Sequence, residues 1–292
     1  IDGEMTSKDL ANALKTVINS VYGLTCASHD NPFKDPRNID NLIAKRGALF
    51  MVNLMYEVKE RGYTVVHIKT DSIKIADADP GIIRFVMDYG ECYGYTFEHE
   101  ATYDRMCLVN NAVYIAKYAT EEKCMSLYGY APGDNKKKGG HWTATGTQFQ
   151  VPYVFKTLFS KEEITFDDLC EVKSVQKGDI YLDFGDGSGD NHNYIFVGRV
   201  GQFCPIVSGA GSGELVCLNN GKYGAITGTK GYRWLESEVV RQRNLQDKID
   251  RTYYNHLVDD AWSSIKEYCD PEWFCSDSEY DPEVGIPGQV PF

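Results

Sequence analysis

Three polar side chains near the start of the chain are spaced so that they share one face of a predicted helix. Lys15, Asn19 and Tyr22 stand at i, i+4 and i+7, and Gly23 follows them. An ammonium, an amide and a phenol aligned over two helical turns are suited to contact a triphosphate, a sugar and a base in turn. The same spacing is typical of a solvated polar face, and helical periodicity alone favours that interpretation.

A second candidate lies in a predicted turn between two short strand-like segments, 64–68 and 73–75. The turn contains Thr70, Asp71 and Ser72. A carboxylate at a hairpin tip is exposed, and magnesium prefers such hard oxygen ligands. Aspartate is also common in turns for purely local reasons, so both interpretations stay open at this point.

The pattern K-x-x-x-N-S-x-Y-G, from Lys15 to Gly23, resembles the fingers-helix motif of family B DNA polymerases residue for residue. This resemblance implies that Lys15 acts in catalysis by contacting the triphosphate of the incoming nucleotide. It implies that Asn19 lines the sugar and phosphate region. Tyr22 and Gly23 would then lie against the minor groove of the nascent base pair.

The turn is similar to the second half of the Y-x-D-T-D-S palm hairpin of the same family. The resemblance implies that Asp71 is a catalytic metal ligand and that Thr70 and Ser72 contact DNA near the primer. His67 stands in place of the tyrosine, and Lys69 in place of the first aspartate. The lysine removes an outer carboxylate and adds a positive charge close to the metals, so we expect weakened activity.

A weaker match follows in the predicted strand pair 95–103 and 105–118. Glu100 resembles a further acidic residue near the catalytic centre, which the resemblance makes a second metal ligand. The later strand resembles the K-K-x-Y segment that touches the primer, but only Tyr114 is retained. Lys117 is then the expected source of charge on the primer.

The resemblance implies nucleotidyl transfer assisted by two Mg²⁺ ions, which requires at least two carboxylates. In the family one carboxylate precedes the fingers helix in a D-x-x-S-L-Y-P segment, and no such segment occurs here. We therefore expect a C-terminal fragment, without the exonuclease, that is inactive alone. Its expected partners are primer-template DNA, dNTPs and the N-terminal remainder of the polymerase. The C-terminal half resembles bacteriophage and prophage polymerases.

Composition limits the other classes of function. The net charge of −12 argues against a broadly basic nucleic-acid-binding protein, although phosphate contacts need only a local basic groove. The nine cysteines form no C-x-x-C pair, so we expect reduced thiols rather than a disulfide or metal framework. No window is apolar enough to span a membrane, and we expect a cytoplasmic protein in a bacterial or phage-infected cell.

Hydrophobic periodicity predicts an α+β fold: a palm-type antiparallel sheet with packed helices, followed by a mixed thumb-like region. Helices are expected near 6–22, 39–61, 79–93, 150–172, 232–242 and 250–268, with glycine-rich strands across 179–229. Gly23 is the expected C-cap of the first helix. The expected divisions are helices at 1–62, a palm sheet at 63–119, a loop boundary at 120–142, a thumb-like domain at 143–276 and a tail at 277–292.

Two other functions remain as alternatives. The first is a non-catalytic nucleic-acid-binding palm remnant, which the lysine in the turn and the replaced primer lysines favour. The second is an unrelated interaction domain whose motifs match by chance.

Overall fold

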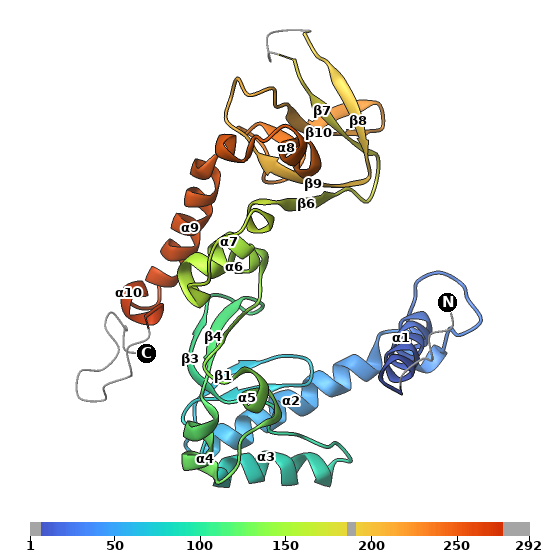
Figure 1. Cartoon of the computed structure of the whole chain (residues 1–292). Coiled ribbons are helices and arrows are strands. Elements are labelled where there is room, and N and C mark those ends of the chain that lie inside the picture. Colours follow the sequence, from blue (N-terminus) through green and yellow to red (C-terminus); the bar gives the residue numbers. More distant parts are fainter. Residues whose placement is uncertain (1–6, 186–190, 277–292) are drawn as a thin grey trace. The chain divides into compact units, whose positions relative to one another are not determined.

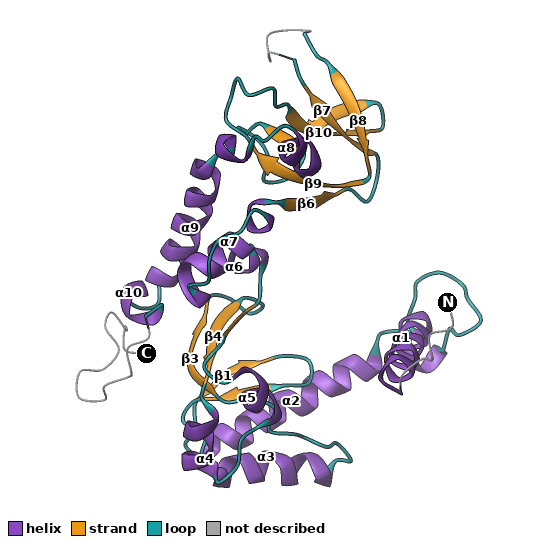
Figure 2. Cartoon of the chain, in the orientation of Figure 1, coloured by secondary structure: helices purple, strands orange, loops and turns teal. Residues whose placement is uncertain are grey.

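The computed structural model describes residues 7–185 and 191–276 (Figure 1). Every strand pair in these ranges is antiparallel, and helices alternate with small sheets (Figure 2). The expected α+β class is confirmed. The chain divides into two compact units: residues up to His99 together with Ser126–Tyr130, and Glu100–Met125 together with the residues from Ala131 onward.

The first helix of the first unit, α1 (Ser7–Thr25), runs beyond its expected end. Gly23 lies inside the helix, so the prediction that it forms the C-cap is wrong. The last turn is held by side chains instead. The Thr25 hydroxyl donates to the Tyr22 carbonyl at 2.7 Å, and the Asn38 amide donates to that hydroxyl at 2.7 Å.

The remaining elements of this unit follow the sequence signals closely. Helix α2 (Leu42–Glu60) ends before Gly62, whose φ of 86° favours glycine. Strands β1 (Val65–Ile68) and β2 (Ile73–Ile75) form the expected hairpin. Helix α3 (Pro80–Cys92) begins after Asp79, whose carboxylate accepts hydrogen bonds from two backbone N–H groups of the first turn.

A small apolar core joins these elements. Leu54 and Val58 of α2 pack with Ile82 and Val86 of α3, and all four side chains are buried. These positions repeat at helical spacing, and their burial accounts for the pairing of the two helices.

The second unit opens with a three-stranded sheet in the order β3 (Tyr103–Leu108), β4 (Tyr114–Tyr118) and β5 (Trp142–Ala144). The expected strand at 95–103 is wrong except at its end, since the chain becomes a strand only at Tyr103. The expected strand at 105–118 is a hairpin. Its turn forms because the Asn110 side chain accepts hydrogen bonds from the N–H groups of Ala112 and Val113.

Residues 120–142 do not form the expected loop, because they contain α4 (Glu121–Tyr128) and α5 (Gly133–Lys138). The buried side chain of Asn135 explains why α5 forms a defined helix. Its amide donates to the carbonyls of Thr102 and Ala119, each at 2.8 Å, and its oxygen accepts from the Thr102 N–H at 2.8 Å. Polar composition suggested a loop, but one fully bonded asparagine secures a helix here.

The C-terminal part contains the expected strands and several short helices. The helical elements are α6 (Thr147–Gln150), α7 (Pro152–Phe155), a π-helical turn (Lys156–Ser160), α8 (Ser237–Gln242), α9 (Arg251–Lys266) and α10 (Pro271–Phe274). The strands are β6 (Glu171–Ser174), β7 (Asp179–Asp183), β8 (Tyr194–Gly198), β9 (Val200–Pro205), β10 (Glu214–Asn219), β11 (Lys222–Ala225) and β12 (Trp234–Glu236). Two short 3-10 turns, Asp167–Leu169 and Gln246–Lys248, also belong to this part, and a third, Pro36–Asn38, lies between α1 and α2 in the first unit.

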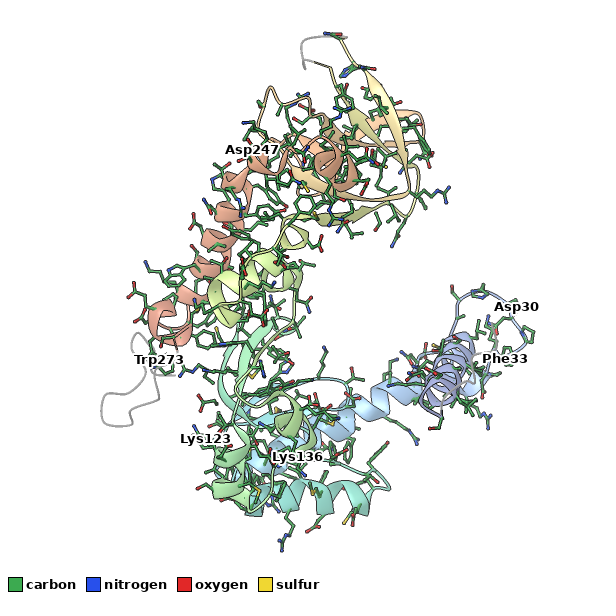
Figure 3. The ribbon with its side chains drawn as sticks, in the orientation of Figure 1. Asp30, Phe33, Lys123, Lys136, Asp247 and Trp273 are labelled. Carbon is green, nitrogen blue, oxygen red and sulfur yellow. The ribbon has the colours of Figure 1, made fainter. Side chains whose placement is uncertain are left out.

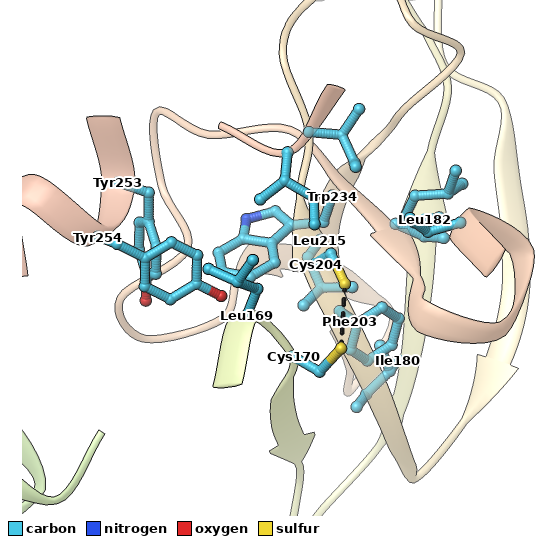
Figure 4. Close-up of a cluster of buried hydrophobic side chains, with 14 residues drawn as sticks. Leu169, Cys170, Ile180, Leu182, Phe203, Cys204, Leu215, Trp234, Tyr253 and Tyr254 are labelled. Atoms are coloured by element: carbon cyan, nitrogen blue, oxygen red, sulfur yellow. Dashed lines mark hydrogen bonds between the residues drawn. The ribbon is translucent and has the colours of Figure 1, made fainter. Parts of the chain in front are cut away.

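These strands form two sheets, β11-β10-β7-β8 and β12-β9-β6. Their inner faces share an apolar core around the fully buried Trp234 and Phe203 (Figure 4). Within it, the thiols of Cys170 and Cys204 lie 3.3 Å apart in a hydrogen bond. All nine cysteines lie in the described ranges and are free thiols, as expected.

Two expectations concern the ends of this region. The single helix expected near 150–172 is replaced by short helical pieces that end before β6. The expected tail at 277–292 lies outside the described residues. Among the described helices, none has both the length and the apolar character needed to cross a membrane.

Candidate functional site

The polar stripe of α1 faces solvent over its first turns. Lys15 and Asn19 are exposed, and neither forms an ion pair with another described residue. Tyr22 is half-buried, and its hydroxyl donates to the side-chain oxygen of Asn41 at 2.5 Å. Gly23 is exposed, with open space around its α-carbon. The helix therefore presents an ammonium and an amide freely, next to a phenol fixed by a neighbouring residue.

The apolar face of the same helix is also uncovered. Leu10 and Leu14 are 47% and 53% exposed, and Val17 and Ile18 are 57% and 65% exposed. The loop that follows, with Asp30 and Phe33, leads to α2 (Figure 3). Apolar side chains at helical spacing normally pack against something, so this face is suited to contact another protein segment.

The turn between β1 and β2 presents Asp71 to solvent. The backbone N–H of Lys69 donates to the Ser72 carbonyl at 2.9 Å and closes the turn. Thr70 and Asp71 are exposed and Ser72 is half-buried. His67, on the strand before the turn, is buried at 7% exposure. The hairpin thus holds the carboxylate at its tip, as the sequence predicted.

One carboxylate is not a two-metal site. Asp79 follows Asp71 in the same unit, but its carboxylate already accepts hydrogen bonds. They come from the hydroxyl of Tyr63 at 2.5 Å and from two backbone N–H groups at the N-terminus of α3. Those hydrogen bonds, the one from Tyr63 foremost, hold the pKa of Asp79 below its ordinary value. Within the described ranges, no cluster of three or more acidic, histidine or cysteine side chains is placed to hold a metal ion. In the described ranges, Asp71 is therefore not part of such a cluster.

The other predicted site residues belong to the second unit. Glu100 is exposed, and its carbonyl accepts a hydrogen bond from the Asp134 N–H at 3.1 Å. Tyr114 and Lys117 both lie on β4, but three positions apart, so they point to opposite faces of the sheet. The ring of Tyr114 lies 6.4 Å from that of Tyr103.

Lys117 instead lies beside an aromatic ring on the other face of β4. Its ammonium is 5.8 Å from the centre of the Trp142 ring. Tyr103 and Tyr118, by contrast, share a face with Tyr114, and their rings lie 5.1 Å apart. A tyrosine cluster therefore surrounds Tyr114, and burial raises the pKa of Tyr103 well above its ordinary value. This cluster was not predicted, although tyrosines spaced four residues apart on a strand indicate a shared face.

Comparison with known proteins adds no assignment. The sequence matches no protein-family model, and it matches no curated protein sequence. The class that the structure defines is an α+β protein with antiparallel sheets, and its function must be argued from its own residues.

Proposed function

We propose that this chain supplies the fingers-helix, palm and thumb part of a template-directed DNA polymerase of family B. The observation that carries the proposal is the exposed stripe of α1. Lys15 and Asn19 are exposed on this helix, and Tyr22, the third residue of the stripe, is held by Asn41. A nucleotide approaching this face would meet an ammonium for its phosphates and an amide for its sugar.

In this proposal the chain's own residues position substrates, and the metal-dependent step needs more than this chain provides. Asp71 stands at a hairpin tip held by backbone hydrogen bonds, which suits a carboxylate that must be presented rigidly. Mg²⁺ would neutralise charge on the phosphates in the complete enzyme. The missing carboxylate is assigned to the N-terminal remainder of the polymerase, in the same cytoplasmic compartment.

The uncovered apolar face of α1 supports a protein partner of this kind. Its four exposed side chains, Leu10, Leu14, Val17 and Ile18, are suited to pack against the supplied part. The proposed partners are therefore this remainder, primer-template DNA and dNTPs.

The experiment compares the purified chain with the same chain supplied with the N-terminal part of a family B polymerase. Extension of a labelled primer by dNTPs with Mg²⁺ is measured. We expect no extension by the chain alone, extension by the pair, and loss of that extension in Asp71→Asn. The matched control is Asp247→Asn, because Asp247 is exposed and lies far along the chain from the hairpin.

Extension by the isolated chain that Asp71→Asn leaves unchanged would refute the proposal. A dNTP-binding measurement gives a second test. Lys15→Ala should weaken triphosphate binding, whereas Lys45→Ala, on the solvent side of α2, should not.

A specific observation also favours a second candidate, a nucleic-acid-binding palm remnant without catalysis. Lys69 places a positive charge two residues from Asp71, and the described ranges hold no group of three or more acidic, histidine or cysteine side chains suited to a metal ion. Magnesium titration separates the two functions. A remnant binds DNA equally with and without Mg²⁺, and Asp71→Asn leaves that binding unchanged.

A further inference from the structure

One face of the four-stranded sheet of the second unit carries a connected row of aromatic rings. Side chains alternate along β7, so Ile180 and Leu182 enter the buried core and Tyr181 points to the opposite face. Phe196 of β8 pairs directly with Tyr181 and shares that face. The outer face of the sheet is therefore aromatic where its inner face is aliphatic.

The rings touch one another without interruption. His192 stacks on Tyr194 with ring centres 5.1 Å apart and planes 15° apart, and Tyr194 stacks on Tyr223 at 3.7 Å and 5°. Tyr181 then meets Tyr223 and Phe196 edge-on, each at 5.5 Å. Five rings from β7, β8, β11 and the segment before β8 thus form one surface, which we name the aromatic face.

Covering the sheet explains only part of this surface. Val216 of β10 pairs with Tyr181 and is buried at 8% exposure, so a ring layer does shield it. Phe196 has no such role, because 60% of its surface is exposed. A phenylalanine has no polar group to hydrate, so its exposure next to other rings indicates a surface that binds something.

The aromatic face is held in place by a buried carboxylate. Asp183 accepts hydrogen bonds from the N–H groups of Gly185 and Asn193, each at 2.9 Å, and from His192 Nδ1 at 2.6 Å. These bonds fix the end of β7 against the start of β8 and hold His192 over Tyr194. The stacking edge of the surface is therefore ordered before any ligand arrives.

The charges around the face are few and mixed. Arg199 is 71% exposed and lies 3.6 Å from Asp179, and Lys222 precedes Tyr223 on the edge strand β11. Glu214 lies on β10 at the level of Asp183. A ligand here would be recognised chiefly by ring stacking, with one or two phosphate contacts at most.

We propose that the aromatic face binds single-stranded DNA by stacking its bases, with Phe196 as the most available ring. Bases in a duplex are already stacked on each other, whereas an unpaired strand offers free base faces to protein rings. The choice of DNA over other flat ligands rests on the proposed function. The stacking surface itself rests on the ring geometry.

The test measures binding of fluorescein-labelled oligothymidylate to the whole chain by fluorescence anisotropy. Phe196→Ala and Tyr223→Ala should each weaken binding roughly 5- to 100-fold, and Phe196→Trp should retain it. The control is Ile195→Ala, because Ile195 is 51% exposed on the same strand but points to the other face. With few basic contacts, affinity should fall with salt at a log–log slope no steeper than roughly −1.4.

Each result decides the proposal. Equal loss in Ile195→Ala and Phe196→Ala, full binding by Phe196→Ala, or a steep salt slope would overturn base stacking at this face. Tighter binding of oligouridylate or of an oligosaccharide would overturn the assignment to DNA. Thermal unfolding of each variant excludes loss of fold, and Phe196→Trp keeps the test open if Phe196→Ala unfolds.

The polymerase proposal fails or survives separately. Lys15→Ala should leave oligothymidylate binding unchanged, since Lys15 belongs to the other unit. If the native chain paired with the N-terminal part of a family B polymerase extends no primer but still binds oligothymidylate, the proposed function alone is refuted. If primer extension is intact and Phe196→Ala does not change oligothymidylate binding, only the proposal for the aromatic face is refuted.

Discussion

The hydroxyl of Tyr22 donates a hydrogen bond of 2.5 Å to the side chain of Asn41, the residue that precedes α2. Asn41 has a positive φ of 53°, a conformation that asparagine tolerates better than most residues. The bond ties the last turns of α1 to the start of α2. The residue assigned by resemblance to the nascent base pair is thus also a structural link within its own unit.

Tyr22→Phe should therefore lower the free energy of unfolding by about 1 kcal/mol, the usual net value of one hydrogen bond. Urea denaturation followed by circular dichroism measures the change. Tyr56→Phe serves as the control, since Tyr56 is 58% exposed and its hydroxyl has no hydrogen-bond partner in the described ranges. An equal loss of unfolding free energy in both variants would show that the link to Asn41 does not stabilise the unit.

Arg105 anchors α10 to β3, and its removal should loosen that helix. The guanidinium donates to the carbonyls of Trp273, Phe274 and Ser276 at 2.9, 3.2 and 3.3 Å. The side chain is only 5% exposed, so Arg105→Met should cost roughly 3 kcal/mol.

The measurement is the rate at which a thiol reagent labels Cys275, which is buried beside α10 at 6% exposure. We expect faster labelling in Arg105→Met. Arg199→Met, at an exposed arginine, should change the rate little. Unchanged labelling in both would mean that apolar packing alone holds α10.

Asp183 should make the stability of the second unit depend on pH. Burial alone would raise the pKa of Asp183, but the N–H groups of Asn193 and Gly185 and the His192 side chain outweigh it and lower the pKa. A carboxyl whose pKa is lower in the folded than in the unfolded protein stabilises the fold fully at pH values above its pKa in the unfolded protein. That stabilisation is lost as the pH falls below about 3.9 and through the folded value.

Asp183→Asn should accordingly reduce the free energy of unfolding by roughly 1–3 kcal/mol at pH 7. The difference from the native chain should shrink as the pH falls below about 4. Denaturation curves at several pH values test this, with Asp247→Asn as an exposed control. A difference that stays constant down to pH 3 would contradict the charge as the cause.

Lys69 should oppose metal binding at the hairpin tip. Replacing it by Asp changes the local charge by two units beside Asp71, which should tighten Mn²⁺ binding roughly tenfold at 0.1 M salt. Electron paramagnetic resonance of free Mn²⁺ gives the affinity. Lys45→Asp, with the same charge change on α2, should bind as weakly as the native chain; equal tightening there would point to net charge rather than to the hairpin.

Local signals in the sequence were sufficient for much of the fold. Asp79 and Pro80 marked the start of α3, Gly62 marked the end of α2, and the apolar alternation around Asp71 predicted the β1–β2 hairpin. Each depends on neighbours within a few residues, where backbone sterics and capping decide the outcome. Composition misled the prediction at 120–142, because the bonds of Asn135 reach Thr102 and Ala119, which are distant in sequence.

The features of the candidate site likewise divide into those that the sequence predicted and those that only the tertiary structure decided. The sequence by itself determined that Lys15, Asn19 and Tyr22 share one stripe of a helix and that Asp71 lies at a hairpin tip. Only the tertiary structure decided that Tyr22 is bound by Asn41, that Tyr114 and Lys117 face apart, and that Phe196 stands exposed among four other rings. These are consequences of strand register and long-range packing, which residue spacing along one chain does not encode.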